Sequence, residues 1–321
     1  MITNFIRYNY KPRYANEFGM ELYDYSIDFQ TNKLLSPYGD YRKGLFRKDK
    51  FGFDENNVFI FKGNDIIYYN PCGIAEYALI CFEQICNAKT VLEQNIKKFK
   101  SQVDWLEQNV TMYKSNCAIW YYNYPNVKPF YSGISQGMII SVLLRAHQYF
   151  KNEKYLDLAW KAFNFLNLDI KDGGLKYSEP PYYCWFEEYL DSPKILNGHI
   201  YSLLGIYDLY RVTKDKEVKK VFDLGIADIK NNIKAFDLGF FTKYDAGTSY
   251  PANNSYHYTH ITLFSILFKI TNDTFFEKYS KKFLKYHTKF FYKIINFIYL
   301  LYLTIVNKLK KIPLLKFQGI F

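Results

Sequence analysis

The sequence of 321 residues lacks several motifs that mark large enzyme classes. It contains no Walker A motif, no G-x-G-x-x-G and no H-E-x-x-H. These patterns respectively bind nucleotide phosphates, hold dinucleotides and carry a catalytic zinc ion. Nucleotide phosphate chemistry therefore has no support in the sequence, and we expect no serine hydrolase either.

Cysteine is scarce, which excludes two further kinds of protein. The five cysteines are odd in number and form no C-x-x-C pair; they are Cys72, Cys81, Cys86, Cys117 and Cys184. A disulfide framework or a structural zinc site is therefore not expected, and a reducing compartment is. His257 and His260 are three residues apart, but no acidic or Cys partner stands at ligand spacing, so we predict no metal site.

No secretory signal is visible in residues 1–14, which lack an apolar core, so we expect a cytoplasmic protein. The other end is different. Residues 290–306 are apolar except for Lys293 and Asn296, and lysines follow them. This segment is slightly shorter than a spanning helix requires. Membrane contact through this tail, and packing against the protein or a partner, both remain open.

Charge points to an anionic partner. The chain has 42 Lys and Arg against 31 Asp and Glu, a net charge of +11. Nucleic acid, an anionic membrane and an acidic carbohydrate would all fit this balance. The basic residues are scattered and no nucleic-acid-binding motif is present, so we do not expect nucleic acid as the partner.

The chain divides by its hydrophobic pattern. Residues 1–73 are predicted to form a short β-hairpin region, with two strands in 58–69 around the turn Gly63-Asn64-Asp65. From residue 74 the apolar residues recur at helical spacing. Eight helices are predicted, near 74–87, 91–108, 136–151, 153–167, 198–212, 215–233, 258–271 and 274–287.

These helices form four pairs whose first members start about 60 residues apart, near 74, 136, 198 and 258. First members are apolar on most sides and should be buried, whereas second members have a charged face. The pattern predicts a mainly α fold, an α/α toroid of helical hairpins. An irregular helical array without a closed ring is the alternative. We expect a catalytic domain at 74–287 and a tail at 288–321.

Three long connectors join successive pairs, at 109–135, 168–197 and 234–257. In a repeating array they emerge on one face, where sites are usually built. The second connector carries Glu187-Glu188-Tyr189 among aromatic residues. Loss of hydration there would raise a carboxyl pKa toward the range of proton transfer. The alternative is a glutamate that caps a helix or pairs with Lys.

The other connectors supply further polar candidates. The third contains Tyr244, Tyr256 and His257, and His260 follows it closely. A tyrosine removes a proton only if nearby positive charge lowers its pKa, and Lys243 or a histidine would be the source. Two candidates for binding substrate follow the first connector, Gln136 and Arg145, the latter as a carboxylate ligand.

Several segments together resemble the C-terminal domain of the D-glucuronyl C5-epimerase family. They are YNPCGIAEYAL (69–79), SGISQGMIISVLLRAH (132–147), WFEEY and LNGHIYSLLGIYDLY (185–210), and KYDAG and YHYTHI (243–261). They occur in the family's order at similar spacing. The resemblance implies an α/α barrel and places the family's catalytic glutamate and three tyrosines on Glu188, Tyr189, Tyr244 and Tyr256. Where animal members have an arginine three residues after the second tyrosine, this chain has Gly247.

The function that this resemblance implies is inversion of C5 in D-glucuronate residues of an acidic, heparosan-like glycan, giving L-iduronate. Glu188 and Tyr256 would work on opposite faces of the ring, and Tyr189 and Tyr244 would orient it or relay protons. Asn197, His257 and His260 join Gln136 and Arg145 as candidate substrate ligands. No cofactor is expected, and a homodimer stays open. A uronate polysaccharide lyase and a non-catalytic glycan-binding protein are the alternatives.

Overall fold

A computed structural model describes residue 34 and residues 51–63, 66–87 and 93–310. The chain begins, within these ranges, with a three-stranded antiparallel sheet in the order β1-β2-β3. Its strands are β1 (Phe51–Phe53), β2 (Phe59–Gly63) and β3 (Ile66–Tyr68). The predicted hairpin is therefore present as β2 and β3, and β1 was not predicted. The turn residues 64 and 65, and the rest of the predicted N-terminal region before residue 51, lie outside the described residues.

Four helical hairpins follow the sheet. Their bounds are α2 (Pro71–Asn87) with α3 (Glu93–Gln108), α4 (Gly133–Phe150) with α5 (Glu153–Leu166), α6 (Leu196–Thr213) with α7 (Lys216–Asn232), and α8 (Asn254–Thr271) with α9 (Thr274–Thr288). The second helices of three pairs have an N-cap residue directly before them, namely Asn152, Asp215 and Asp273. The side chain of each cap accepts hydrogen bonds from backbone N–H groups in the first turn. These capping residues explain why a short turn is enough to join the two helices of each of these pairs.

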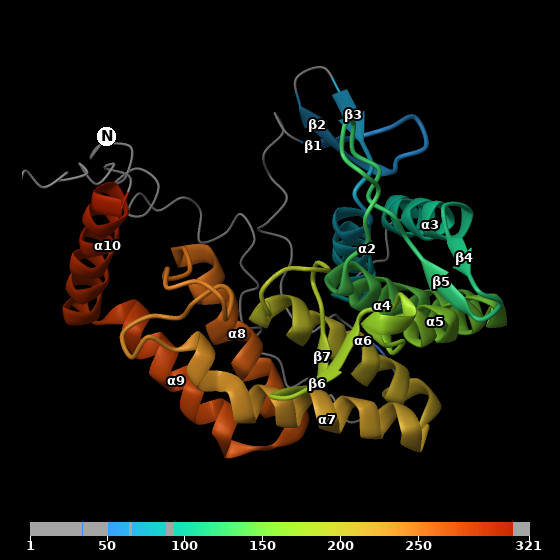
Figure 1. Ribbon diagram of the computed structural model, residues 1–321. Helices are drawn as coiled ribbons and strands as arrows, with labels where there is room; N and C mark the ends of the chain where they lie inside the picture. The colour runs from blue at the N-terminus through green and yellow to red at the C-terminus, as the bar shows by residue number, and fades with distance from the viewer. Residues whose placement is uncertain (1–33, 35–50, 64–65, 88–92, 311–321) are drawn as a thin grey trace, which may run out of the picture.

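Burial separates inner from outer helices as the sequence predicts. Nearly every residue of α6 is buried, whereas α7 buries one stripe. The inner helices pack in chain order, α2 on α4, α4 on α6 and α6 on α8. Gly205 of α6 lies against Gly137 of α4, where an added Cβ would come within 2.2 Å of the Gly137 carbonyl oxygen. The prediction of a mainly α, α/α-toroid fold is confirmed, and the hairpins form an arc of the toroid (Figure 1).

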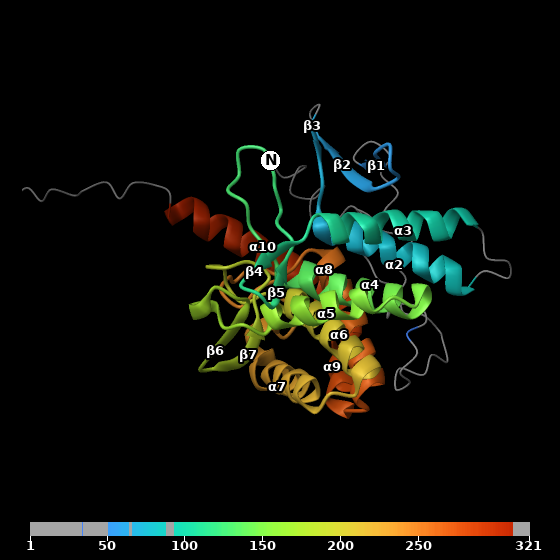
Figure 2. The same ribbon diagram turned by 90° about the vertical axis from the view of Figure 1, so that its right-hand side faces the viewer.

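The connectors contain short strands that the sequence did not reveal. The first holds the hairpin β4 (Thr111–Tyr113) and β5 (Cys117–Ile119), and the second holds β6 (Lys176–Glu179) and β7 (Tyr182–Phe186). Figure 2 shows the β1–β3 sheet beyond the α2/α3 hairpin and the β6/β7 hairpin beside α7. β7 ends directly before Glu187, so a strand carries the predicted catalytic segment.

The predicted apolar tail forms α10 (Phe290–Lys310), which packs on α9 at the edge of the molecule (Figure 1). Within the described ranges, one helix is long and apolar enough to cross a membrane, Phe290–Asn307 of α10. Residues 311–321 of the predicted tail lie outside the described residues. The domain limits at 73/74 and 287/288 stay predictions.

Candidate active site

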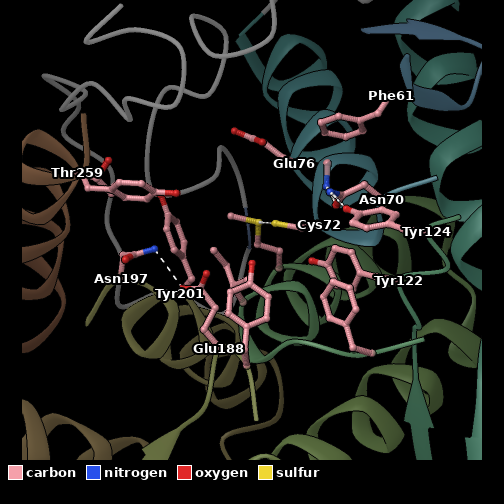
Figure 3. Close-up of a pocket in the computed structure, with 16 residues that line it drawn as sticks. Phe61, Asn70, Cys72, Glu76, Tyr122, Tyr124, Glu188, Asn197, Tyr201 and Thr259 are labelled. Carbon is pink, nitrogen blue, oxygen red and sulfur yellow. Dashed lines mark hydrogen bonds between the residues drawn. The ribbon is translucent and has the colours of Figure 1, made fainter. Parts of the chain in front are cut away.

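One pocket lies where the four inner helices begin. It has a volume of about 310 Å³, at the small end of the range for ligand sites. Each inner helix contributes residues from its first two turns, for example Gly73, Ile134, Asn197 and Tyr256. Aromatic side chains make up much of the wall: Phe61, Tyr122, Tyr124, Phe130, Tyr189, Tyr201 and Tyr256 (Figure 3).

Glu188 reaches this pocket because β7 is held firmly on α6. The backbone N–H of Phe186 donates to Nδ1 of His199 at 3.0 Å. Nε2 of the same ring lies 3.1 Å from the carbonyl oxygen of Gly225, to which it donates. Burial lowers the pKa of His199 to about 3, so the ring is neutral and can accept and donate at once. His199 was not predicted as a site residue. It affects the position of Glu188 indirectly, by holding the end of β7 in place.

Glu188 is 4% exposed, and polar side chains surround its carboxyl group. Oε1 accepts a 3.0 Å hydrogen bond from the hydroxyl of Tyr244, and Oε2 lies 3.4 Å from Nδ2 of Asn197. Burial raises the pKa of Glu188 to about 7, against the opposing hydrogen bonds from Tyr244 and Tyr189. A carboxyl with this pKa can take up and release a proton near neutral pH.

Gly198 makes room for this carboxyl. A Cβ at Gly198 would lie 2.4 Å from Oε2 and 2.6 Å from Cβ of Glu188. The glycine in the L-N-G segment is therefore required by the close approach of Glu188 to the first turn of α6.

Tyr244 and Tyr256 lie next to each other, with ring centroids 4.5 Å apart, and their hydroxyl groups are hydrogen bonded. Burial raises the pKa of each phenol, and the neighbouring Glu188 charge raises it further. The expectation of a tyrosine with a lowered pKa is therefore wrong. Lys243, the proposed source of positive charge, instead donates to the carbonyl oxygen of Thr248. Both tyrosines are protonated at neutral pH and suited to donate.

Glu187 points away from the pocket. Its carboxylate is buried and forms an ion pair with Lys194, whose ammonium group lies 3.5 Å from the ring centroid of Tyr177. The alternative of pairing with Lys therefore applies to Glu187, and not to Glu188. The ion pair spans the turn that carries Glu188 and Tyr189, so Glu187 stabilises this turn without entering the pocket.

Two predicted substrate ligands are structural. Arg145 is fully buried and forms a 2.6 Å ion pair with Asp208 of α6. Gln136 is also fully buried, and its Nε2 donates to the carbonyl oxygen of Ala118 at 2.9 Å. Neither lines the pocket. These positions argue against the substrate-binding roles predicted for Arg145 and Gln136, because both side chains lie outside the pocket and donate into the scaffold. Oε1 of Gln136 is buried and has no hydrogen-bond partner among the described residues.

His257 and His260 are structural as well. The Thr242 hydroxyl lies 2.8 Å from Nδ1 of His257 and 3.0 Å from Nδ1 of His260. Burial lowers the pKa of both rings, that of His260 to about 3. They fasten the third connector to α8 as neutral rings, and neither lines the pocket, which argues against their predicted contact with substrate. Nε2 of His260 is buried and has no hydrogen-bond partner among the described residues. In the described ranges no group of three or more His, Cys, Asp or Glu side chains is arranged to hold a metal ion.

Asn197 does line the pocket. Its side chain is buried, and among the described residues Oδ1 has no hydrogen-bond partner. A buried acceptor without a partner is costly, and a sugar hydroxyl would satisfy it.

Sequence reasoning missed Glu76. It lies on α2, lines the pocket, and burial raises its pKa to about 7. Glu76 lies in the segment YNPCGIAEYAL (69–79), which resembles the epimerase family. Its spacing to Glu188 along the chain gives no sign that the two carboxyl groups share one cavity.

One motif match also needs its structural context. Residues 133–137 read Gly-Ile-Ser-Gln-Gly, which fits G-x-S-x-G. Ser135 is fully buried in the first turn of α4, and its hydroxyl donates to the carbonyl oxygen of Ser132 at 2.8 Å. A nucleophilic serine must be exposed on a strand-to-helix turn. Ser135 is therefore not placed as a nucleophile.

Comparison with known proteins gives both relatives and a fold. A D-glucuronyl C5-epimerase from Caenorhabditis elegans is 32% identical over 176 residues, which cover 49% of this chain and 28% of that protein. A Methanocaldococcus jannaschii protein named "Uncharacterized protein MJ1128" is 29% identical over 196 residues, covering 58% of this chain and 61% of that protein. The chain spans less than two thirds of either relative.

A solved structure agrees with the helical architecture. The GH76 alpha-mannanase BT2949 of Bacteroides thetaiotaomicron superposes with a TM-score of 0.50 and 11% sequence identity, over 74% of this chain and 63% of that one. At this identity the likeness concerns the fold alone. Residues 107–285 match the family described as D-glucuronyl C5-epimerase C-terminus, and they make up more than half of the chain. The chain therefore belongs to the D-glucuronyl C5-epimerase family, through the region that the family description assigns to the C-terminus.

Proposed function

We propose that this protein is an epimerase that inverts C5 of D-glucuronate residues in an acidic glycan, giving L-iduronate. One observation carries the proposal. The buried Glu188 carboxyl, with a pKa of about 7, lies in a sugar-sized aromatic pocket beside two hydrogen-bonded phenols, Tyr244 and Tyr256. Family membership and the Caenorhabditis elegans relative, named D-glucuronyl C5-epimerase, support the substrate class.

In the proposed reaction ionised Glu188 removes the C5 proton, and the Tyr256 hydroxyl delivers a proton to the opposite face of the ring. This leaves Glu188 protonated and Tyr256 as a phenolate. Tyr244 is hydrogen bonded to both groups. It can therefore pass the proton from Glu188 to Tyr256 and restore the starting state. Tyr189, which also hydrogen bonds Glu188, would help to hold the carboxylate.

The intermediate places extra negative charge on the sugar carboxyl group, and the pocket is built to receive it. Four helices begin at its wall, and the backbone N–H groups at helix N-termini favour anions. Part of this capacity is used within the protein, since Asn70 and Asn253 accept from the N–H groups of Gly73 and Tyr256.

The test is isotope exchange. Purified protein is incubated in D₂O with heparosan and other glucuronate-containing glycans, and deuterium at C5 is measured by NMR. We expect exchange by the wild type and about 10³-fold slower exchange by Glu188→Gln. Absence of exchange with every glycan would contradict the proposal.

The same experiment separates the alternatives. A uronate lyase would also remove the C5 proton but would release an unsaturated, ultraviolet-absorbing sugar. A non-catalytic glycan-binding protein would bind without turnover, and Glu188→Gln and Tyr256→Phe would leave its affinity unchanged.

A further inference from the structure

Two carboxyl groups share the pocket. Glu76 projects from α2 and Glu188 follows β7, with Cys72 between them (Figure 3). The charges of both glutamates raise the pKa of the Cys72 thiol, second to its burial. Among the described lining residues there is no Lys, Arg or His. A uronate would bring a third carboxylate into this space, which requires that at least one carboxyl be neutral.

We propose that Glu76, in its protonated form, donates a hydrogen bond to the carboxylate of the bound uronate while Glu188 faces the C5 hydrogen. This inference rests on the proposed function. A hydrogen bond at the carboxylate would also stabilise the charge that develops there when the C5 proton leaves. Glu76 would thus take the place of a cationic ligand.

The surroundings of Glu76 suit this role. Burial raises its pKa to about 7, and a bound anion would raise it further, so binding takes up a proton. Three elements pack against α2. α3 contributes no lining residue, and β2 and α4 contribute only the apolar Phe61, Ile134 and Met138. The titratable groups that share the pocket are Glu188, Cys72, Tyr122, Tyr124, Tyr189, Tyr201 and Tyr256.

Binding measured against pH tests the role of Glu76. Glu188→Gln serves as the reference protein, because it removes the second carboxyl and nearly all turnover. We expect its affinity for a glucuronate oligosaccharide to fall as the pH rises above 7, by up to about tenfold per pH unit. Adding Glu76→Gln keeps a donor but removes the titration, so affinity should become pH-independent within about threefold. Glu76→Asp in the same background should keep the pH dependence.

Glu93→Gln, on the exposed side of α3, is the matched control and should behave as the reference. If Glu76→Gln leaves the pH dependence unchanged, the role of Glu76 is wrong. The proposed function would still stand in that case, provided that the wild type exchanges the C5 proton. Absence of both exchange and binding would overturn both.

A second, independent observation concerns α10. Its solvent-facing side is a continuous apolar strip, the α10 strip, with Phe290 75% and Ile298 58% exposed. The strip consists of Phe290, Phe291, Ile294, Ile298, Leu301, Tyr302 and Ile305. The opposite side packs on the protein, where Tyr292 meets Tyr286 and Tyr299 meets Phe240. Exposed apolar area of this extent marks an interaction site.

Charge indicates what covers the strip. Residues 278–321 contain ten lysines and no Asp or Glu. The rest of the chain therefore has 42 − 10 = 32 basic residues against 31 acidic ones, a net charge of only +1. Six of these ten lysines belong to residues 289–321, and four lie on α9, where Lys281 and Lys282 pair with Glu277 and Asp237. More than half of the net charge therefore accompanies the α10 segment. Apolar side chains joined to lysines, without acids, suit an anionic lipid surface.

We infer that α10 lies in the surface of an anionic membrane, with the α10 strip in the acyl boundary and the lysines at the headgroups. Lys289 and Lys293 are exposed at its start. A spanning orientation would expose Asn296 and Leu300 to lipid, and both are buried against the protein. The helix therefore lies on the membrane and does not cross it.

Vesicle flotation of the full chain tests this inference. We expect binding to vesicles of phosphatidylcholine with one third phosphatidylglycerol, little binding to phosphatidylcholine alone, and release at high salt. The double variant Phe291→Glu/Ile298→Glu should bind at least tenfold less. Leu224→Glu, which changes an exposed leucine on α7, is the control and should bind as the wild type.

Three results would overturn it. They are no binding to anionic vesicles, binding unaffected by the strip variant, and a wild-type dimer in solution that the strip variant converts to a monomer. The last result would assign the strip to a second copy of the chain.

Discussion

The hydroxyl of Tyr244 donates a 3.0 Å hydrogen bond to Oε1 of Glu188, across 56 residues of sequence. The two connectors that carry them are joined by backbone contacts beside this bond. The Ala246 N–H donates to the Lys194 carbonyl oxygen at 2.9 Å, and Ile195 pairs with Asp245. The geometry between base and phenol therefore depends on a contact between loops and not on either loop alone.

Tyr244→Phe should move the pH profile of activity. Glu188 works as a base only when ionised, so its pKa of about 7 should set the acid limb of the kcat/KM profile, while loss of the Glu76 proton should set the alkaline limb. The Tyr244 hydroxyl favours the ionised form of Glu188, and its loss should shift the acid limb to higher pH by roughly one unit, about 1.4 kcal/mol. Tyr250→Phe, on the same connector and partly exposed, should leave the limb in place. An unshifted limb in Tyr244→Phe would show that the bond does not tune the base.

Two adjacent glutamates should behave differently. Glu188→Gln should reduce C5 exchange by about 10³-fold, because it removes the base. Glu187→Gln should keep exchange within about tenfold and should instead lower stability, since it leaves Lys194 without its buried partner. Exchange rates and urea unfolding of both variants separate the two roles. The reverse pattern would mean that the wrong glutamate is assigned to the pocket.

Gly198→Ala should impair catalysis more than folding. The new methyl group would occupy the space of the Glu188 carboxyl, 2.4 Å from Oε2, and push it aside. A displacement of about 1 Å can cost roughly 100-fold in kcat, whereas overpacking costs about 1–3 kcal/mol of stability. Gly52→Ala in β1, where only the flexible Lys62 side chain is near, is the control. Normal kcat in Gly198→Ala would contradict the proposed position of Glu188.

Arg145→Met should destabilise the protein without raising KM. It removes the 2.6 Å ion pair of the buried Asp208 and leaves the contact with Arg211 at 3.4 Å in place. Breaking a buried pair costs about 3–5 kcal/mol, and the remaining contact places this case at the lower end. Urea unfolding and KM on the folded variant test it. Arg145→Met/Asp208→Leu should recover part of the loss. A raised KM with unchanged stability would restore Arg145 as a substrate ligand.

The helices could be predicted from the sequence because the repeat determines them. Apolar residues at helical spacing mark α4 and α6, and the polar residues Asn152 and Asp215 mark where their partners begin. The strands β4 to β7 could not be predicted, because three to five residues carry no reliable alternation.

From the sequence, the candidate site could be predicted only at the residues that a family motif marks. The resemblance indicated Glu188, Tyr244 and Tyr256, and the structure brings these three together. Glu76 comes from a different hairpin, and no local sequence signal shows that it lines the same pocket as Glu188. Arg145 was misread for the same reason, since its partner Asp208 lies 63 residues away.

Because its walls come from all four hairpins, from Gly73 on α2 to Thr259 on α8, the pocket exists only once the last hairpin has docked. Folding of the first three hairpins alone would leave Glu188 without Tyr244 and Tyr256. A glycan that binds this cavity therefore stabilises the docked arrangement of all four hairpins. The melting temperature of the whole chain should rise with glycan concentration.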